Sequence, residues 1–209
     1  MVTGYASFVN RFLLLNTVFH SGIGLVMQRV LGEILHIILF EPKSIGEYQN
    51  HNKAPTILIL LALAMTIGFV SPIEGASVIG NYSFFIFAVF LNILVAAIFF
   101  QYWFRVKGIQ TEPEPLCLFF ALALAINNLT LPSYKLANYF DSMLFFYANS
   151  TLITYSFIVL IYGLAKSVNS SLGFVFLGLA TCSVLLFFSL AILQSLFIFY
   201  GFLPIPLGA

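Results

Sequence analysis

Five long stretches without a charged side chain constrain this sequence more than any other feature. They cover residues 54–71, 83–104, 116–131, 142–165 and 172–202. A helix needs about 20 apolar residues to cross the hydrocarbon core of a bilayer. Hydrophobic residues make up 61% of the chain and charged residues only 7%, whereas soluble domains carry about 25% charged residues. The sequence therefore predicts an all-α polytopic membrane protein, a single membrane domain over residues 1–209 with about five transmembrane helices.

The segment before the first span, residues 5–40, is apolar but carries ionisable side chains. At 100° per residue, Arg29, Glu33 and His36 fall on one face, which predicts an amphipathic helix with a polar stripe. Such a segment either lies flat at the interface or forms a re-entrant hairpin that turns near residues 21–24. The stripe is a candidate contact for lipid headgroups or a partner's loop, or Arg29 and Glu33 form an ordinary ion pair four residues apart.

The basic residues predict the orientation of the chain. With five spans, Lys135 falls on one side and all other basic residues fall on the opposite side. These are Arg11, Arg29, Lys43, Lys53, Arg105, Lys107 and Lys166. Because loops rich in Lys and Arg stay in the cytoplasm, we expect a cytoplasmic N-terminus and an external or lumenal C-terminus. The membrane would be a bacterial inner membrane or an organelle membrane.

The predicted spans contain no Asp, Glu, Lys or Arg, the groups that move protons and ions through membranes. Their absence counts against a proton pump, a proton-coupled transporter or an intramembrane aspartyl protease, but not against a passive channel. No catalytic residues and no metal site are expected, since on one helix His20 and His36 would point about 160° apart. No cofactor is required and bound lipid is expected, while a pigment or quinone stays an open alternative. A net charge of +1 gives no reason to expect nucleic acid as a partner.

Side-chain amides within the spans or at their ends are the candidate polar contacts. They are Asn92, Gln101, Asn127, Asn128, Asn149 and Gln194. Amides in membrane helices commonly form hydrogen bonds between helices, and we interpret these residues in that way. The alternative is that the asparagines at 92, 127, 128 and 149 line one pore or substrate cavity.

The remaining features predict a role in assembly. The chain holds 25 phenylalanines, often in adjacent pairs, and small residues such as Gly173 and Gly178 that allow helices to approach closely. Without a catalytic constellation, the sequence predicts a non-enzymatic scaffold or accessory subunit of a larger membrane protein assembly. Its partners would be other integral membrane proteins and lipid. The alternative function is a passive channel or small-molecule carrier.

Several motifs follow one another in a familiar order. They are LFEPKSIGEY and KAP before the first span, FRVKG after the second, FFALALA and LTLP in the third, and LITYSFIVLIYGLAKSVNSSLGFVFLGLA across the last two. Over roughly residues 35–200 the chain resembles the Yip family of Ypt- and Rab-interacting membrane proteins and its prokaryotic relatives. The resemblance implies five helices, a cytoplasmic N-terminus, an external C-terminus and no known catalytic residues. The chain lacks the long cytoplasmic N-terminal region of eukaryotic members, which counts against a GTPase partnership.

Overall fold

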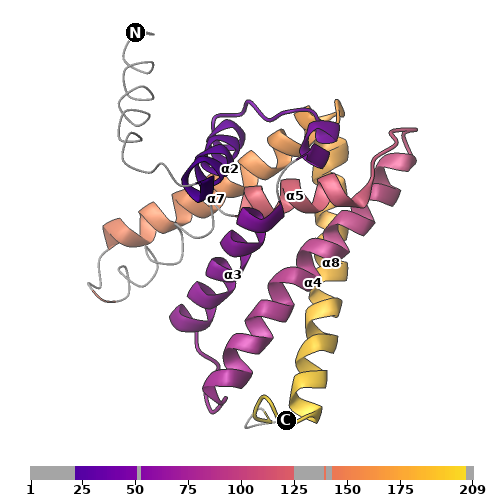
Figure 1. Cartoon of the computed structure of the whole chain (residues 1–209). Coiled ribbons are helices and arrows are strands. Elements are labelled where there is room, and N and C mark those ends of the chain that lie inside the picture. Colours follow the sequence, from indigo (N-terminus) through magenta and orange to yellow (C-terminus); the bar gives the residue numbers. More distant parts are fainter. Residues whose placement is uncertain (1–21, 51–52, 125–138, 140–142, 206–209) are drawn as a thin grey trace.

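The computed structural model describes residues 22–50, 53–124, 139 and 143–205, and within these residues every regular element is a helix (Figure 1). The elements are α2 (Gly22–Ile38), the short 3-10 helix η2 (Ile45–Asn50), α3 (Lys53–Val70), α4 (Val78–Arg105), α5 (Pro113–Leu124), α7 (Met143–Ser167) and α8 (Leu172–Phe199). The prediction of an all-α fold is confirmed for this part of the chain.

Three helices are long and apolar enough to cross a membrane, namely Val78–Arg105, Phe146–Ser167 and Leu172–Phe199. At 1.5 Å per residue, the 28 residues of α4 or α8 extend about 42 Å, more than the thickness of a hydrocarbon core. These helices coincide with the predicted runs 83–104, 142–165 and 172–202, apart from a few residues at their ends.

The other two predicted runs correspond to shorter apolar helices. α3 has an apolar part over Thr56–Val70, and α5 is described over Pro113–Leu124. The rest of the predicted run 116–131 lies outside the described residues, as does the first part of the segment 5–40. The structure thus supports three long apolar helices and leaves the number of crossings as a proposal.

α4 is the central helix, and it packs against α3, α5 and α8. The side chain of Ser77 caps its first turn by accepting a hydrogen bond from a backbone amide. At its other end Gly108 has a φ of +74°, and the amide of Ile109 donates to the carbonyl of Phe104 at 3.1 Å. This Schellman arrangement uses glycine because its left-handed backbone is strained for other residues. It turns the chain toward α5.

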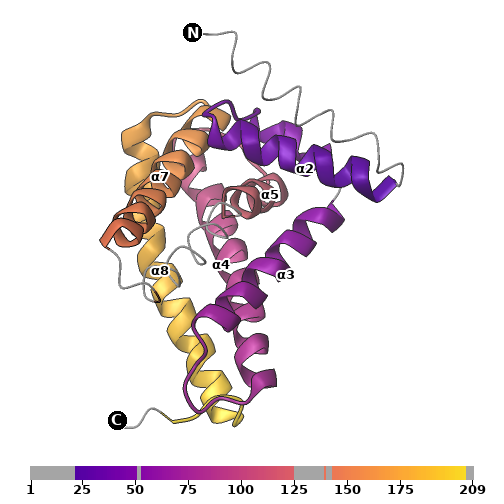
Figure 2. The same ribbon diagram turned by 90° about the vertical axis from the view of Figure 1, so that its left-hand side faces the viewer.

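The best-covered part of the core surrounds α5, where every residue from Leu118 to Ala123 is buried. α5 contacts α4, α3, α7, α2 and η2, which enclose it from several sides. α2 lies crosswise to α4 and α8 at this end of the molecule, as Figure 2 shows. α8 is far less covered, since only Val175, Gly178 and Cys182 are buried along its length.

Candidate functional site

Basic side chains of the described residues connect helix ends at one end of the molecule. Lys53 at the start of α3 pairs with Glu114 at the start of α5. Lys107, just after α4, donates to the serine that precedes α8 at 3.2 Å. Lys166 at the end of α7 donates at 2.8 Å to the carbonyl of Phe40, which follows α2. The ends of α4, α7 and α2 and the starts of α3, α5 and α8 therefore lie together, and they form the polar end of the molecule.

The predicted polar stripe of α2 is divided by the fold. The Glu33 side chain is only 5% exposed, and it pairs with Lys43 in the segment that connects α2 to η2. His36 is about half exposed, with Nδ1 3.9 Å from a carboxylate oxygen of Glu41. Glu33 is thus covered rather than open to headgroups or a partner, because the residues that follow α2 fold back over it. The side chain of Arg29 lies outside the described part of the structure.

Tyr48 of η2 completes this buried cluster. Its side chain is fully buried, and its ring packs edge-on against Phe119 of α5 with centroids 5.9 Å apart. Burial raises the pKa of Tyr48 well above its usual value, and the nearby Glu33 carboxylate raises the pKa further. A backbone hydrogen bond at Lys43 acts in the opposite direction. The cluster holds α2 and η2 against α5.

The end of α2 is clamped to α7 at Phe40. This residue has a φ of +60°, a left-handed conformation that is uncommon for residues with a large side chain. Its ring contacts Tyr155 and Tyr162 edge-on, with centroids 5.8 and 5.1 Å away. The Tyr155 hydroxyl also donates to the carbonyl of Ile38 at 2.6 Å. These contacts offset a backbone cost of about 1–2 kcal/mol.

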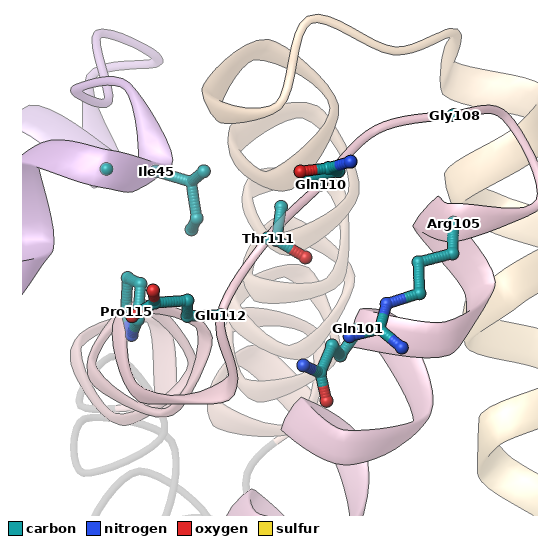
Figure 3. Close-up of a pocket in the computed structure, with 9 residues that line it drawn as sticks. Ile45, Gln101, Arg105, Gly108, Gln110, Thr111, Glu112 and Pro115 are labelled. Atoms are coloured by element: carbon teal, nitrogen blue, oxygen red, sulfur yellow. The ribbon is translucent and has the colours of Figure 1, made fainter.

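A polar pocket of about 640 Å³ opens at the same end, between η2, the last turns of α4 and the loop that leads into α5 (Figure 3). Its lining residues are Ile45, Gly46, Gln101, Arg105, Gly108, Gln110, Thr111, Glu112 and Pro115. The sequence analysis singled out Gln101 as a helix contact and Arg105 as an orientation signal. It missed the pocket because the walls come from three segments that only the fold brings together.

The pocket has a basic wall and an acidic wall. Gln101 and Arg105 lie one turn apart on α4, whereas Glu112 lies beside Pro115 on the opposite wall, and Thr111 lies between them (Figure 3). Thr111 is 8% exposed, and its hydroxyl oxygen is buried without a hydrogen-bond partner among the described residues. Such a group costs free energy until a partner reaches it.

The predicted amide contacts have different surroundings. Asn149 is buried near the start of α7, and Gln194 is exposed on α8. Asn92 is half-buried on α4, and its side-chain oxygen is buried without a hydrogen-bond partner in the described chain. Asn127 and Asn128 lie outside the described residues. None of the three described amides lines the polar pocket, although Gln101 does.

Asn81, which the sequence analysis did not single out as a contact, makes the clearest interhelical hydrogen bonds. It is buried at the start of α4, and its amide nitrogen donates to the carbonyl of Gly68 in α3 at 2.9 Å. Its side-chain oxygen accepts from the amide of Ile73, in the connecting turn, at 2.9 Å. One amide thus joins the end of α3, the turn and the start of α4. The sequence signal that could have indicated this contact is the position of Asn81, four residues after Ser77, the residue that caps α4.

A shallow apolar groove of about 480 Å³ runs along the outer side of α8. Phe188, Ala191, Ile192, Ser195, Leu196 and Phe199 line it. Ala191 and Ser195 are four residues apart, so they lie on the same side of the helix and form a small-residue pair. The Ser195 hydroxyl donates to the carbonyl of Ala191 at 2.8 Å, and its polarity is therefore satisfied within α8.

The described residues contain no group of three or more His, Cys, Asp or Glu side chains that could hold a metal ion. With its apolar composition and three long apolar helices, the fold is compatible with an integral membrane protein. No protein-family model and no curated protein match the sequence, and no solved structure matches the fold. The resemblance to the Yip family therefore rests on the sequence motifs alone.

Proposed function

We propose that this chain is a non-enzymatic, Yip-like membrane protein that serves as a scaffold or accessory subunit of a larger membrane protein assembly. The observation that carries the proposal is the groove on α8. In lipid, helices associate through shape fit and a few hydrogen bonds, because lipid tails are as apolar as leucine. Small residues at 191 and 195 lower the floor of the groove, and Phe188 and Phe199 are among the large residues that line it. This shape suits a helix of another integral membrane protein.

The proposal includes five crossings with the polar end in the cytoplasm. α3 has 18 residues and extends about 27 Å, nearly the thickness of a hydrocarbon core, and a fifth crossing requires α5 to continue beyond Leu124. Lys53, Lys107 and Lys166 make their contacts at the polar end, which the distribution of basic residues in membrane proteins places inside. The crosswise direction of α2 (Figure 2) favours the arrangement in which it lies flat at the interface.

Cysteine labelling tests this orientation. In a background without the two native cysteines, an impermeant reagent added outside should label a Glu74→Cys variant and not a Ser44→Cys variant. Glu74 lies in the turn between α3 and α4, whereas Ser44 lies just before η2. Labelling of Ser44→Cys alone would reverse the proposed orientation.

Co-purification from native membranes in a mild detergent tests the assembly role. We expect Ser195→Leu to fill the groove and lower the fraction of tagged chain that migrates in a complex. Ser183→Leu is the matched control, because Ser183 is also exposed on α8 and also donates to its own helix, at Ala180. A wild-type chain that stays monomeric in detergent and in native nanodiscs would refute the assembly role.

A passive channel or carrier is the second candidate, and one observation favours it. The side-chain oxygens of Asn92 in α4 and Thr56 in α3 are buried without a hydrogen-bond partner in the described residues, so water or a polar solute would satisfy them. Flux of small solutes into liposomes that contain the purified chain, lost in Asn92→Leu with folding intact, would support this function over the scaffold.

A further inference from the structure

We infer that the polar pocket beside Arg105 binds the phosphodiester group of a membrane phospholipid through Gln101, Arg105 and Thr111. The inference rests on the proposed membrane location but not on the assembly role of α8. A pocket of about 640 Å³ falls within the range of about 300–1,000 Å³ that is typical of small-molecule sites. It is large enough for a phosphate group and the carbon atoms next to it.

The buried hydroxyl of Thr111 is the observation that points to a ligand. Thr111 is only 8% exposed, and its hydroxyl oxygen has no hydrogen-bond partner among the described residues. A buried polar group without a partner costs free energy. The hydroxyl is directed toward the wall that carries Gln101 and Arg105 (Figure 3). A ligand oxygen between these side chains would give the hydroxyl its missing partner.

Arg105 supplies the positive charge of the site. In the described part of the chain its guanidinium pairs with no carboxylate, and it lies 5.3 Å from the ring centroid of Tyr102. A guanidinium forms charge-assisted hydrogen bonds with phosphate oxygens, often through two N–H groups at once. The Gln101 amide, one turn away, and the Thr111 hydroxyl can donate as well. Three donor groups around one cavity suit a ligand that accepts hydrogen bonds, and the positive charge selects an oxyanion.

The charge of the lining favours a phosphodiester over a phosphate with a free end. Among the described lining residues Arg105 is the only basic one, and one guanidinium balances the single negative charge of a diester. A phosphate monoester carries about −1.5 to −2 at neutral pH. The Glu112 carboxylate on the opposite wall already takes part in an interaction of its own, so the ligand is not required to neutralise it.

The position of the pocket indicates a lipid as the source of the phosphate. Tyr102 and Trp103 lie in the last turn of α4, and Tyr and Trp are enriched at the level of lipid headgroups. Leu94 and Ile98 are exposed apolar residues of the same helix. With Gln101 and Arg105 they occupy one stripe about 60° wide at 100° per residue. A lipid whose tail lies along this stripe would bring its phosphate to the pocket, whereas a water-soluble ligand would not use the apolar part.

The test follows thermal unfolding of the full chain in maltoside micelles through the fluorescence of Trp103, the one tryptophan of the sequence. A ligand that binds only the folded chain raises the unfolding midpoint. We expect phosphatidylglycerol to raise it more than monogalactosyl diacylglycerol with the same acyl chains, in which a neutral sugar replaces the phosphate. Arg105→Gln should raise the apparent Kd for phosphatidylglycerol about tenfold or more, because a charge-assisted hydrogen bond is lost.

Thr111→Val separates a binding role of the hydroxyl from a structural role. Valine has nearly the shape of threonine but no hydroxyl, so the midpoint without added lipid should not fall. In titrations with phosphatidylglycerol this variant should bind about tenfold more weakly. A lower midpoint without lipid, together with unchanged lipid affinity, would assign the hydroxyl to the fold alone and would overturn the inference.

Lys107→Gln is the matched control, because Lys107 is an exposed basic residue two positions after Arg105 that does not line the pocket. It should keep wild-type lipid affinity. Equal midpoint shifts with the two lipids, or unchanged affinity in Arg105→Gln, would overturn the inference. Loss of the lipid-induced shift on addition of millimolar glycerophosphoglycerol would assign the pocket to a soluble phosphodiester and would also overturn it. A chain that stays monomeric would refute the assembly role without changing these results, so the two failures can be distinguished.

Discussion

Replacing Lys43 by methionine should release α2 and η2 from α5. Lys43 pairs with Glu33, whose side chain is 5% exposed, while the Lys43 side chain is 35% exposed. Methionine keeps much of the lysine stem but removes the charge, so the buried Glu33 carboxylate would lose its ion pair with Lys43. Because the carboxylate cannot reach water without undocking, the free energy of local opening should fall.

The magnitude follows from the burial of the two partners. Breaking a buried ion pair costs about 3–5 kcal/mol when both charges are enclosed. Since water reaches part of Lys43, we expect a smaller loss of about 2 kcal/mol, which corresponds to amide exchange about 30-fold faster. The double variant Glu33→Gln, Lys43→Met removes both charges and should recover more than half of this loss.

Hydrogen–deuterium exchange of the α2 and η2 peptides measures the effect under conditions where exchange reports the opening equilibrium. Lys53→Met is the matched control, because it breaks an exposed ion pair with Glu114, with side chains 58% and 47% exposed. Exposed pairs contribute at most about 1 kcal/mol. If Lys43→Met accelerates exchange in α2 no more than the control does, the Glu33 pair does not hold α2 in place.

Three further predictions concern Tyr48, Gly178 and Asn81. The folded-state pKa of Tyr48 is raised above its usual 10.0. The stabilising contribution of Tyr48 should therefore be complete below about pH 10 and decline as the pH rises further. Thermal unfolding at pH 9 and pH 11 should show that Tyr48→Phe loses less stability at the higher pH than the wild type does. A Cβ at Gly178 would lie 2.7 Å from the indole nitrogen of Trp103, so Gly178→Ala should destabilise the fold by about 1–3 kcal/mol and shift the tryptophan emission. A Cβ at Gly173 would meet nothing within 4 Å, so Gly173→Ala should change neither the stability nor the emission in this way. Asn81→Leu should cost about 1–3 kcal/mol in detergent-denaturation midpoints, because a carbonyl of α3 and a turn amide lose their partner, and an unchanged midpoint would contradict a joining role.

Helix positions could be predicted from the sequence because apolar length and hydrogen bonding within a helix are local properties of each segment. A run such as 172–202 must satisfy its backbone hydrogen bonds within itself, so apolar length alone indicates a helix, and α8 begins at the predicted residue. The conformation of Phe40 could not be predicted in this way. A left-handed phenylalanine is unfavourable locally, and it forms here in contact with Tyr155, Tyr162 and Lys166 of α7.

The candidate site residues show the same difference between what one segment determines and what the packing of several segments determines. Periodicity placed Glu33 and His36 on one face of a helix, which is a property of one segment, but it could not show that the chain returns to bury Glu33 against Lys43. Likewise, Arg105 carried an orientation signal as a single charge, while its pocket needed walls from η2 and from the loop before α5. The search for amides within the predicted spans singled out Asn92, whose side-chain oxygen has no hydrogen-bond partner in the described residues. It missed the hydrogen bonds of Asn81, because these depend on how α3 and α4 pack.

The sequence by itself determined the helical class and the long apolar helices, because these depend on hydrophobic composition and on hydrogen bonds within each helix. Only the tertiary structure decided which polar groups are covered, as at Glu33 and Tyr48, and which ones line a common pocket, as at Arg105, Thr111 and Glu112. The physical reason is that helix formation depends on neighbours within about four residues, whereas burial and electrostatic pairing depend on segments that are distant in the chain.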